Sequence, residues 1–388
     1  MTSKQRMVAA LSGKMPDRLP VTTHHIMPYY LEHCLNGMKE DAFWDTFGLD
    51  AIRWVLPHKP APGSKDYPDP LQQACASIGF FESHRVSNDN WRVYFEDISA
   101  AGRKMTRYSF VTPRGTLTMT VEDADYTAWV TEPLIKNKRD IDLIGEYVTT
   151  PVCDVDAVNK AADEFGERGI VRGHICGWDV FGQAGCWQDA CCLVGTERLI
   201  LEANDDPEWV CELLAIMQRR KMGFIRSLKG ARYDLLEMGG GDASSSVISP
   251  RLFDRFVAPY DAPLIEALHE AGQRTVYHLC GKLMPMLGRM LDMKVDAIET
   301  FTPTGMGGDT DLKKAHAMID GKACMIGGFD QLHFFTGCDE AATRAEVRRC
   351  FEEAGAGGRF ILSPSDHFFD ARTELVRAFA EEATSCNY

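Results

Sequence analysis

Short apolar runs alternate with amphipathic stretches along much of the chain. Runs of aliphatic and β-branched residues, bounded by turn-forming residues, predict strands. We expect eight of them, at 19–23, 50–55, 169–175, 233–238, 274–279, 295–300, 322–326 and 359–363. The stretches between the later strands have the spacing of apolar positions that is typical of helices packed on one face.

Two of the expected helices have clear start and stop signals. One begins with Ser249 as the cap and Pro250 at the first helical position, and it ends at Gly272. Another begins at Pro207 and ends near Gly230. Proline at the start and glycine after the end are the usual terminal residues of a helix. Eight strands alternating with helices, with no glycine-rich dinucleotide turn, predict a single (β/α)₈ TIM barrel over residues 1–388 rather than an open doubly wound sheet.

One region departs from this alternation. Between about 85 and 150 the runs WRVYFEDI, GRKMTRYSFV and GTLTMTVE have period-two polarity and many β-branched and aromatic residues. We expect an antiparallel β insertion here, between the second and third barrel strands. Insertions in barrels usually lie on the face that carries the active site.

Composition and charge exclude several classes of function. The 388 residues carry a formal charge of −14, which disfavours binding to nucleic acid or to an anionic membrane surface. No apolar run approaches the length of a membrane span, and the N-terminus lacks the pattern of a signal peptide. We therefore expect a cytoplasmic enzyme whose 13 cysteines are mostly buried thiols. The sequence leaves the oligomeric state open, a homo-oligomer included.

The expected strand ends are rich in side chains that bind metals or move protons. Active residues of barrel enzymes lie at the carboxyl ends of the strands. Those ends carry, in chain order, His24, His25, Trp54, His58, His174, Cys176, Glu237, Asp242, His278, Cys280, Glu299, Asp330, Asp366 and His367.

The sharpest pattern among them is YHLCGK at 277–282. Residues two apart on a strand point the same way, so His278 and Cys280 converge as two metal ligands would. Imidazole together with thiolate favours zinc. Glu299, at the end of the next strand, is the expected third ligand, and the fourth is Asp366, His367, water or substrate. The alternative is a packed histidine and cysteine.

The remaining strand-end residues have less specific patterns. We expect His24, Asp366 and His367 to act as acids or proton carriers, and His25, Trp54, His58, His174, Glu237 and Asp242 to contact substrate. His174 and Cys176 form a second His-x-Cys pair, which competes with the first. Each of these residues could instead have a packing or helix-capping role.

Seven segments together resemble one known group of proteins. They are KQRMVAALSGKMPDRLPV (4–21), TPRGTLT (112–118), EPLIK (132–136), SPRLFDRFVAPY (249–260), YHLCG (277–281), GGFD (327–330) and GRFILSPSDHF (358–368). They resemble the uroporphyrinogen decarboxylase-like superfamily. The resemblance implies a single (β/α)₈ barrel, in agreement with the strand count.

The resemblance favours one branch of that superfamily. True uroporphyrinogen decarboxylases carry an arginine-rich loop after the first strand, where this chain reads THHIMPYY. The corrinoid-dependent methyltransferases use an HxC zinc motif, which His278 and Cys280 match. In their coenzyme M members a cysteine follows the last strand, and Asp366 stands in that place here. Glu299 finds a parallel in the barrel of cobalamin-independent methionine synthase, where a glutamate on the strand after HxC also binds zinc.

These expectations combine into one functional hypothesis. A zinc ion held by one thiolate, one imidazole and carboxylate is a harder Lewis acid than a thiolate-rich one, and it prefers to polarise oxygen. We therefore expect a methyltransferase that moves a methyl group from a small methylated substrate, such as a methyl ether or methoxylated compound, to the corrinoid (cobalamin) of a separate corrinoid protein. The alternatives are a lyase acting without metal and a non-catalytic barrel that binds a corrinoid protein.

Overall fold

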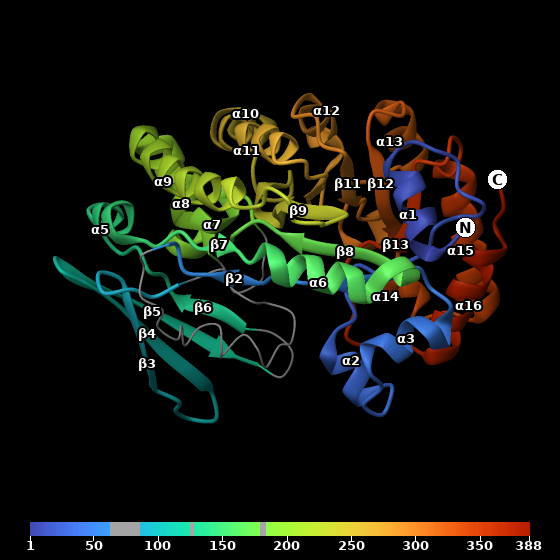
Figure 1. Ribbon diagram of the computed structural model, residues 1–388, viewed down its shortest axis with the longest axis horizontal. Helices are drawn as coiled ribbons and strands as arrows, with labels where there is room; N and C mark the ends of the chain where they lie inside the picture. The colour runs from blue at the N-terminus through green and yellow to red at the C-terminus, as the bar shows by residue number, and fades with distance from the viewer. Residues whose placement is uncertain (63–85, 125–127, 179–183) are drawn as a thin grey trace.

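Seven parallel strands form the central sheet of the computed structural model, which describes residues 1–62, 86–124, 128–178 and 184–388. Neighbours in the sheet are hydrogen-bonded in parallel throughout. The strands are, in sheet order, β1 (Ala51–Trp54), β8 (Gly169–His174), β9 (Leu235–Gly239), β10 (Thr275–His278), β11 (Ala297–Thr300), β12 (Cys324–Phe329) and β13 (Phe360–Pro364). The sheet curls, with helices on its outer side (Figure 1), and this confirms the predicted TIM-barrel-like α/β fold.

The segment predicted as the first strand, 19–23, is reduced to one bridge that joins the two edges of the sheet. Val21 pairs in parallel with Leu362 of β13. The amide of Asp50, next to β1, donates to the carbonyl of Val21 at 2.7 Å. The buried Asp50 carboxylate accepts from the Val21 amide at 3.0 Å and from Arg6 Nη1 at 2.6 Å. The Asp50 carboxylate therefore makes a hydrogen bond to the Val21 amide that a backbone carbonyl would make in a longer strand.

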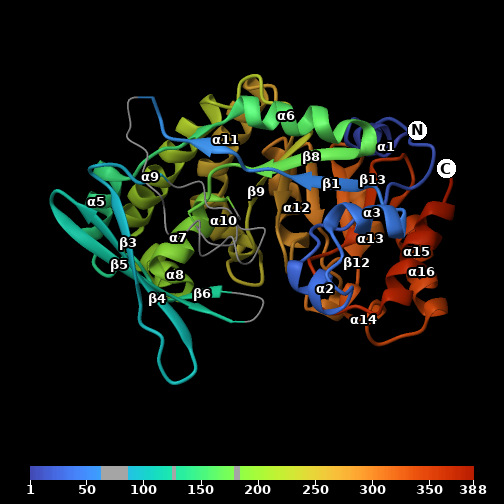
Figure 2. The same cartoon turned by 60° about the horizontal axis from the view of Figure 1, so that its bottom comes forward.

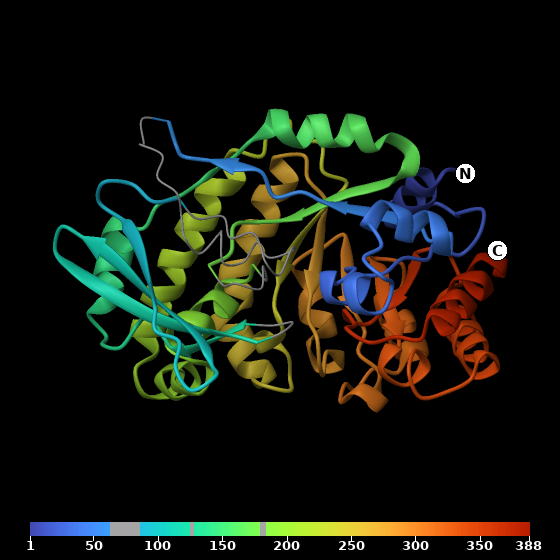
Figure 3. The ribbon, with the colours of Figure 1, turned by 90° about the horizontal axis from the view of Figure 1, so that it is seen from below.

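Helices cover the outside of the sheet and its connections (Figure 3). They are α1 (Ser3–Leu11), α2 (Pro28–His33), α3 (Glu40–Phe47), α5 (Asp140–Tyr147), α6 (Val155–Phe165), α7 (Cys186–Val194), α8 (Thr196–Asp205), α9 (Pro207–Arg226), α10 (Pro250–Phe256), α11 (Ala258–Glu270), α12 (Leu287–Asp292), α13 (Leu312–Ile319), α14 (Gln331–Phe334), α15 (Glu340–Ala354) and α16 (Thr373–Ser385), with short 3₁₀ turns at Gly166–Arg168, Gly241–Ala243, Met284–Met286 and Thr304–Met306. Among the described residues, none of the helices has the length and apolar character needed to cross a membrane.

The single helix expected from Pro250 to Gly272 is in fact two helices. The first ends at Phe256 and the second begins at Ala258. Pro259 explains the break, because proline has no amide to donate to the carbonyl four residues earlier and its ring crowds that carbonyl. The helical spacing of apolar residues continues across such a break, so the hydrophobic pattern alone predicts one continuous helix.

The cap of α10 provides a test of local stability. Ser249 is exposed, and its hydroxyl accepts from the Leu252 amide at 3.3 Å. We expect Ser249→Ala to lower the free energy of unfolding by about 1 kcal/mol, whereas Ser249→Asp, which keeps an acceptor, should preserve it. Urea unfolding followed by tryptophan fluorescence measures both. Equal losses in the two variants would contradict the capping role.

A second sheet, antiparallel, is formed by residues between β1 and β8 in the chain. Its strands are β3 (Arg92–Asp97), β4 (Lys104–Thr112), β5 (Gly115–Asp123) and β6 (Ala128–Glu132), in that order, and a short pair joins β2 (His58–Lys59) to β7 (Val152–Cys153). The sheet has one strand more than the three apolar runs had indicated. It lies at the end of the molecule opposite the two chain termini (Figures 1 and 2). Trp91 and Phe110 attach it to Trp178 just after β8, with ring centroids 5.8 and 6.4 Å from that indole.

Candidate metal centre and active site

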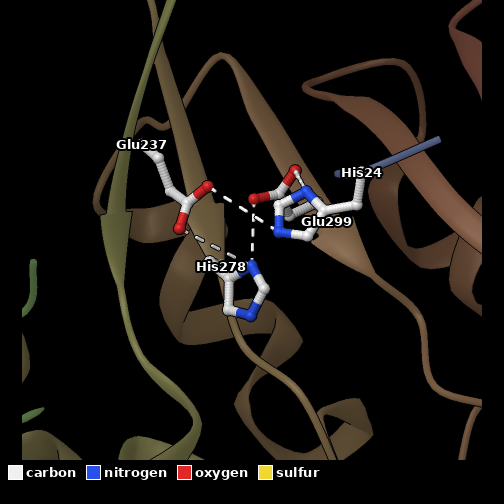
Figure 4. A group of neighbouring side chains, drawn as sticks. All are labelled: His24, Glu237, His278 and Glu299. Atoms are coloured by element: carbon white, nitrogen blue, oxygen red, sulfur yellow. Dashed lines mark hydrogen bonds and ion pairs between the residues drawn. The ribbon is translucent and has the colours of Figure 1, made fainter. Parts of the chain in front are cut away.

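Four buried side chains converge at the carboxyl ends of the strands. His24 follows the Val21 bridge, and Glu237, His278 and Glu299 lie on β9, β10 and β11. Each offers one nitrogen or oxygen atom, and these atoms all lie within 4.8 Å of one another. Figure 4 shows the four side chains pointing toward a common centre. This buried group could bind a metal ion.

The strand register brings these residues together. His278 of β10 pairs directly with Glu299 of β11, so their side chains are neighbours on the same face. On the other side, β9 approaches β10 closely at Gly239, two residues after Glu237. Gly239 has φ of +99°, and a Cβ there would lie 2.5 Å from the His278 carbonyl oxygen. Glycine therefore permits the approach that places Glu237 beside His278.

Arg172 of β8 is a fifth member of this cluster. Its Nη2 lies 2.6 Å from both carboxylate oxygens of Glu299 and 2.9 Å from Glu237 Oε2. The guanidinium also stacks on the indole of Trp54, with 4.6 Å from Cζ to the ring centroid. Only 1% of the Arg172 side chain is exposed. The two glutamates therefore share a buried, permanently charged counter-cation.

The imidazole of His278 contacts a different group through each nitrogen. Nδ1 lies 3.0 Å from Glu299 Oε1, and Nε2 lies 3.3 Å from the sulfur of Cys280. Cys280 is partly exposed, in contrast to the buried glutamates. The predicted His-x-Cys pair is thus in contact, but the sulfur lies on the side of the ring away from Glu299.

Two threonines fix the loop that carries Cys280. The Thr300 hydroxyl donates to the Leu279 carbonyl at 2.8 Å, and the Thr302 hydroxyl accepts from the Gly281 amide at 3.1 Å. Thr300 and Phe301 have φ of +90° and +46°, values that non-glycine residues rarely adopt. Such backbone strain persists where the surrounding structure enforces it, often at functional sites.

The two carboxyl groups differ in their electrostatics. Burial raises the pKa of Glu237 to about 8, and the neighbouring charge of Glu299 adds to the effect. Burial raises the pKa of Glu299 too, but the guanidinium of Arg172 holds it well below the usual range. Glu299 is therefore the charged partner of Arg172. An ionised carboxylate only accepts hydrogen bonds, so Nδ1 of His278 carries the proton in their contact.

Burial lowers the pKa of both histidines, but the net shifts are opposite. Burial lowers the pKa of His24 to about 3, despite the nearby Glu299. Burial opposes charge on His278 too, but Cys280 and Glu237 raise its pKa well above the ordinary value. His24 is therefore neutral near pH 7.

Aromatic rings continue from the cluster toward the surface. The His24 ring stacks on His278 with centroids 4.9 Å apart, and His25 lies 3.8 Å from His24 and 4.7 Å from Trp54. His367 follows at 6.3 Å from His25. Its Nδ1 lies 3.0 Å from Asp366 Oδ1, and both side chains are 31% exposed. Burial raises the pKa of Asp366, but the neighbouring His367 and His278 lower it more, so the net pKa lies below its ordinary value.

Other residues predicted from the sequence have contacts outside this cluster. Nδ1 of His58 lies 3.2 Å from the Leu56 carbonyl, and His58 pairs with Cys153 in the short β2–β7 ladder. Asp242 contacts the amide group of Gln188 on α7 at 3.0 Å. Asp330 caps α14 and contacts His333 at 2.9 Å. None of the three belongs to the metal-capable group found among the described residues.

The competing pair, His174 and Cys176, contributes no atom to the metal-capable group found among the described residues. Nδ1 of His174 lies 2.8 Å from the Ile175 carbonyl. The sulfur of Cys176 faces the Arg220 carbonyl on α9, at 3.9 Å, and burial raises the pKa of this thiol. Its sulfur is thus directed at the helix layer.

The donor chemistry at His278 fits zinc. In a tetrahedral site with bonds of about 2.0 Å to nitrogen and 2.3 Å to sulfur, the two donors lie about 3.5 Å apart. The observed separation of His278 Nε2 and Cys280 Sγ is 3.3 Å. A hydrogen bond from the second ring nitrogen to a carboxylate, as from Nδ1 to Glu299, is the usual support of a metal-binding histidine.

Sequence reasoning missed Arg172. The signal was present, because Arg172 is a charged residue inside the otherwise apolar strand GIVRGHI and shares its strand face with His174. A buried arginine needs carboxylate partners. They are Glu237 and Glu299, 65 and 127 positions later in the chain, so β8 alone does not reveal them.

Comparisons with known proteins agree with this architecture. Residues 168–385 match the family of uroporphyrinogen decarboxylase (URO-D). A methyltransferase from Methanosarcina mazei superposes with a TM-score of 0.57 over 99% of this chain and 98% of its own, at 15% identity. A B12-independent methionine synthase from Shewanella sp. W3-18-1 reaches a TM-score of 0.38 at 8% identity, over 61% of this chain and 67% of its own. No curated protein matches the chain.

The family match covers the part of the molecule that holds most of the site. It extends from just before β8 to the end of α16, and so includes Arg172, Glu237, His278, Cys280 and Glu299. The Methanosarcina structure shows that the same fold extends over the whole chain. Because the match spans more than half of the sequence, this chain belongs to the uroporphyrinogen decarboxylase family.

Proposed function

We propose that this protein is a zinc-dependent methyltransferase. It would transfer a methyl group from a small methylated molecule, a methyl ether or another methoxylated compound, to the cobalt of a corrinoid carried by a separate protein. The observation that carries the proposal is His278, whose two nitrogens contact Glu299 and Cys280 at the mouth of a barrel. The structural likeness to a protein described as a methyltransferase agrees with it.

The donors around His278 suit chemistry at an oxygen atom. When bound, zinc supplies Lewis-acid stabilisation of the negative charge that develops on a leaving oxygen. His278 and Cys280 would hold the ion, and Glu299 is the third residue that the sequence indicates. These donors include one sulfur atom, since position 366 is an aspartate and not a second cysteine. Zinc held by them is a harder Lewis acid than zinc in a thiolate-rich site.

The side chains next to His278 would orient the substrate. The rings of His25 and Trp54 lie near the cluster, with centroids 4.7 Å apart and planes tilted by 53°. The indole nitrogen of Trp54 donates to the His24 carbonyl at 3.3 Å, which fixes both residues. We expect a small organic substrate to contact these rings.

The Asp366–His367 pair is the best placed group to supply a proton. As the methyl group leaves, the carbon–oxygen bond breaks with its electron pair on oxygen, and that oxygen takes up a proton. His367 is partly exposed and in contact with Asp366, so it can exchange protons with water. The buried, neutral His24 lacks a proton to spare and is better suited to packing against His278.

Metal analysis and a methyl-transfer assay test the proposal together. We expect about one zinc per chain in the purified protein and its loss from Cys280→Ala, with the fold retained by circular dichroism. With zinc bound, the protein should methylate reduced cobalamin from at least one member of a panel of aliphatic and aryl methyl ethers, followed by the absorbance of methylcobalamin.

The same experiment separates the alternatives. No zinc in the purified protein, even after loading, would overturn the proposal and favour a metal-free lyase of the same fold. If Cys280→Ala retains its zinc, the Cys280 thiolate is not one of the zinc ligands. Zinc binding without methyl transfer from any member of the panel would overturn the methyltransferase assignment while leaving the metal site.

A further inference from the structure

The antiparallel sheet has an open edge at β3. This strand is the first in the order β3–β4–β5–β6, and within the described part of the chain it pairs with β4 alone. The amide of Ile98, directly after β3, donates to the Met105 carbonyl at 2.9 Å. In an antiparallel pair, residues bonded to the neighbouring strand alternate with residues whose backbone groups point away from it. Counting back from Ile98, the amides and carbonyls of Val93 and Phe95 point away from β4.

Two aromatic side chains on this edge strand are exposed. Tyr94 and Phe95 are 51% and 61% exposed, and as consecutive strand residues they lie on opposite faces of the sheet. Proteins commonly protect an edge strand with proline, with lysine or by keeping it short. The six residues of β3, RVYFED, include neither proline nor lysine. An edge strand of this kind is suited to pairing with another strand through its backbone.

The charges of β3 are arranged symmetrically about Tyr94. Arg92 lies two residues before it and Glu96 two residues after it. A two-fold axis normal to the sheet at Tyr94 would continue the sheet with a second copy of β3 in antiparallel orientation. Arg92 would then lie directly across from Glu96 of the partner subunit, on the same face of the sheet, and the same pair would occur twice.

The backbone agrees with this register. Val93 and Phe95, whose amides and carbonyls point outward, would lie opposite each other and exchange two hydrogen bonds at each of the two symmetric positions. Tyr94 would lie opposite its own copy, as a closely spaced pair without hydrogen bonds. A register centred on Phe95 would instead set Tyr94 opposite Glu96 and leave Arg92 opposite no acidic residue. Charge therefore selects the register centred on Tyr94.

Neighbouring charges are compatible with the pairing. Glu96 has the exposed Arg107 of β4 as its register partner, so in the pairing it would lie between that arginine and the partner's Arg92. Arg92 lies 3.7 Å from Asp89, and the two side chains are 40% and 69% exposed. An exposed ion pair of this kind contributes little and can rearrange.

We propose that this protein forms a homodimer in which β3 pairs with β3 of a second copy in antiparallel orientation, centred on Tyr94. The two four-stranded sheets then form one continuous sheet. The interface lies on the antiparallel sheet, at the end of the molecule opposite the chain termini (Figure 1). It involves no metal and no substrate, so it is independent of the proposed methyl transfer.

Sedimentation equilibrium of the full-length protein at several concentrations tests the proposal. We expect a reversible equilibrium between one and two chains in the wild type. Arg92→Glu and Glu96→Arg each place like charges opposite each other, and each should raise the dissociation constant at least about tenfold. The double variant exchanges the two charges and should restore association to within about threefold of the wild type. Lys160→Glu, which makes the same charge change at a 76% exposed residue of α6, should associate as the wild type does.

A cross-link tests the register directly. Opposed residues of a pair without hydrogen bonds have Cα atoms about 4.5 Å apart, within the range of a disulfide. Tyr94→Cys treated with diamide should therefore give a covalent dimer on a non-reducing gel that the wild type does not give. Phe95→Cys is the matched control, because its cysteine would face Val93 of the partner subunit and should remain uncoupled.

Four results would overturn the proposal. The first two are a wild type that stays monomeric at every concentration and a dimer that neither charge reversal weakens. The third is a double variant that stays dissociated although each single reversal dissociates the dimer. The fourth, which remains decisive if circular dichroism shows that a charge variant has lost its fold, is equal cross-linking of Tyr94→Cys and Phe95→Cys.

Discussion

Replacing His278 with alanine is expected to remove the bound metal and to reduce methyl transfer by at least about 10³-fold. Both metal arrangements that the geometry permits use this imidazole, through Nε2 with Cys280 or through Nδ1 with the carboxylates. Lewis-acid stabilisation of a leaving oxygen contributes several kcal/mol, and each 1.4 kcal/mol corresponds to a factor of about ten in rate.

The fold should survive this substitution. His278 lies at the end of β10, and its loss leaves the pair of Arg172 and Glu299 intact. Zinc content, circular dichroism and the cobalamin assay are measured on the same preparation. His174→Ala, in the competing motif, should keep its zinc. Full metal content in His278→Ala would contradict the placement of the site, and unfolding would show that the residue is structural.

The second large effect is expected at Lys221, a buried residue of α9. Its Nζ is fully buried between α9 and α7, 2.6 Å from Asp189 Oδ2 and 2.9 Å from the Cys176 carbonyl. Lys221→Met removes the cation beside the buried Asp189 carboxylate, which keeps its hydrogen bond from the Trp178 amide at 2.6 Å. We expect the free energy of unfolding to fall by about 3–5 kcal/mol.

A double substitution tests the physical reason for this loss. If the penalty comes from an uncompensated charge, Lys221→Met combined with Asp189→Leu should be more stable than Lys221→Met alone. Burial lowers the pKa of Lys221, but Asp189 raises it above 10.5 overall. The stabilisation that comes from the raised pKa of Lys221 is therefore present at neutral pH and is lost as the pH rises through that pKa. A loss below about 1 kcal/mol in Lys221→Met would contradict the argument.

The barrel could be predicted from the sequence because each strand is a compact apolar run. The five runs from β9 to β13 were placed within a few residues, since parallel strands buried on both faces are recognisable without their partners. The segment 19–23 was harder. It has the composition of a strand but forms a single bridge, because the Asp50 side chain provides part of its hydrogen bonding.

The site was predictable only in part. The i, i+2 spacing of His278 and Cys280 is a local property, and the contact between their side chains follows from it. The positions of Glu237 and His24 relative to His278 depend on register between strands and on the close approach at Gly239, which no local pattern encodes. Arg172 required knowledge of its two carboxylate partners, which come from elsewhere in the chain.

The reduction of the first strand to the Val21 bridge has a consequence for how the site can vary. His24 and His25 begin only three residues after this bridge, so they belong to the least extensively hydrogen-bonded position of the ring. His278 and Glu299 lie on strands paired on both sides, and Cys280 lies in the loop directly after β10. The proposed metal donors and the proposed substrate-facing rings therefore belong to different structural elements. Substitutions in the segment after Val21 should therefore change the choice of substrate without changing the proposed metal ligands. Such a separation favours the evolution of new substrate specificities.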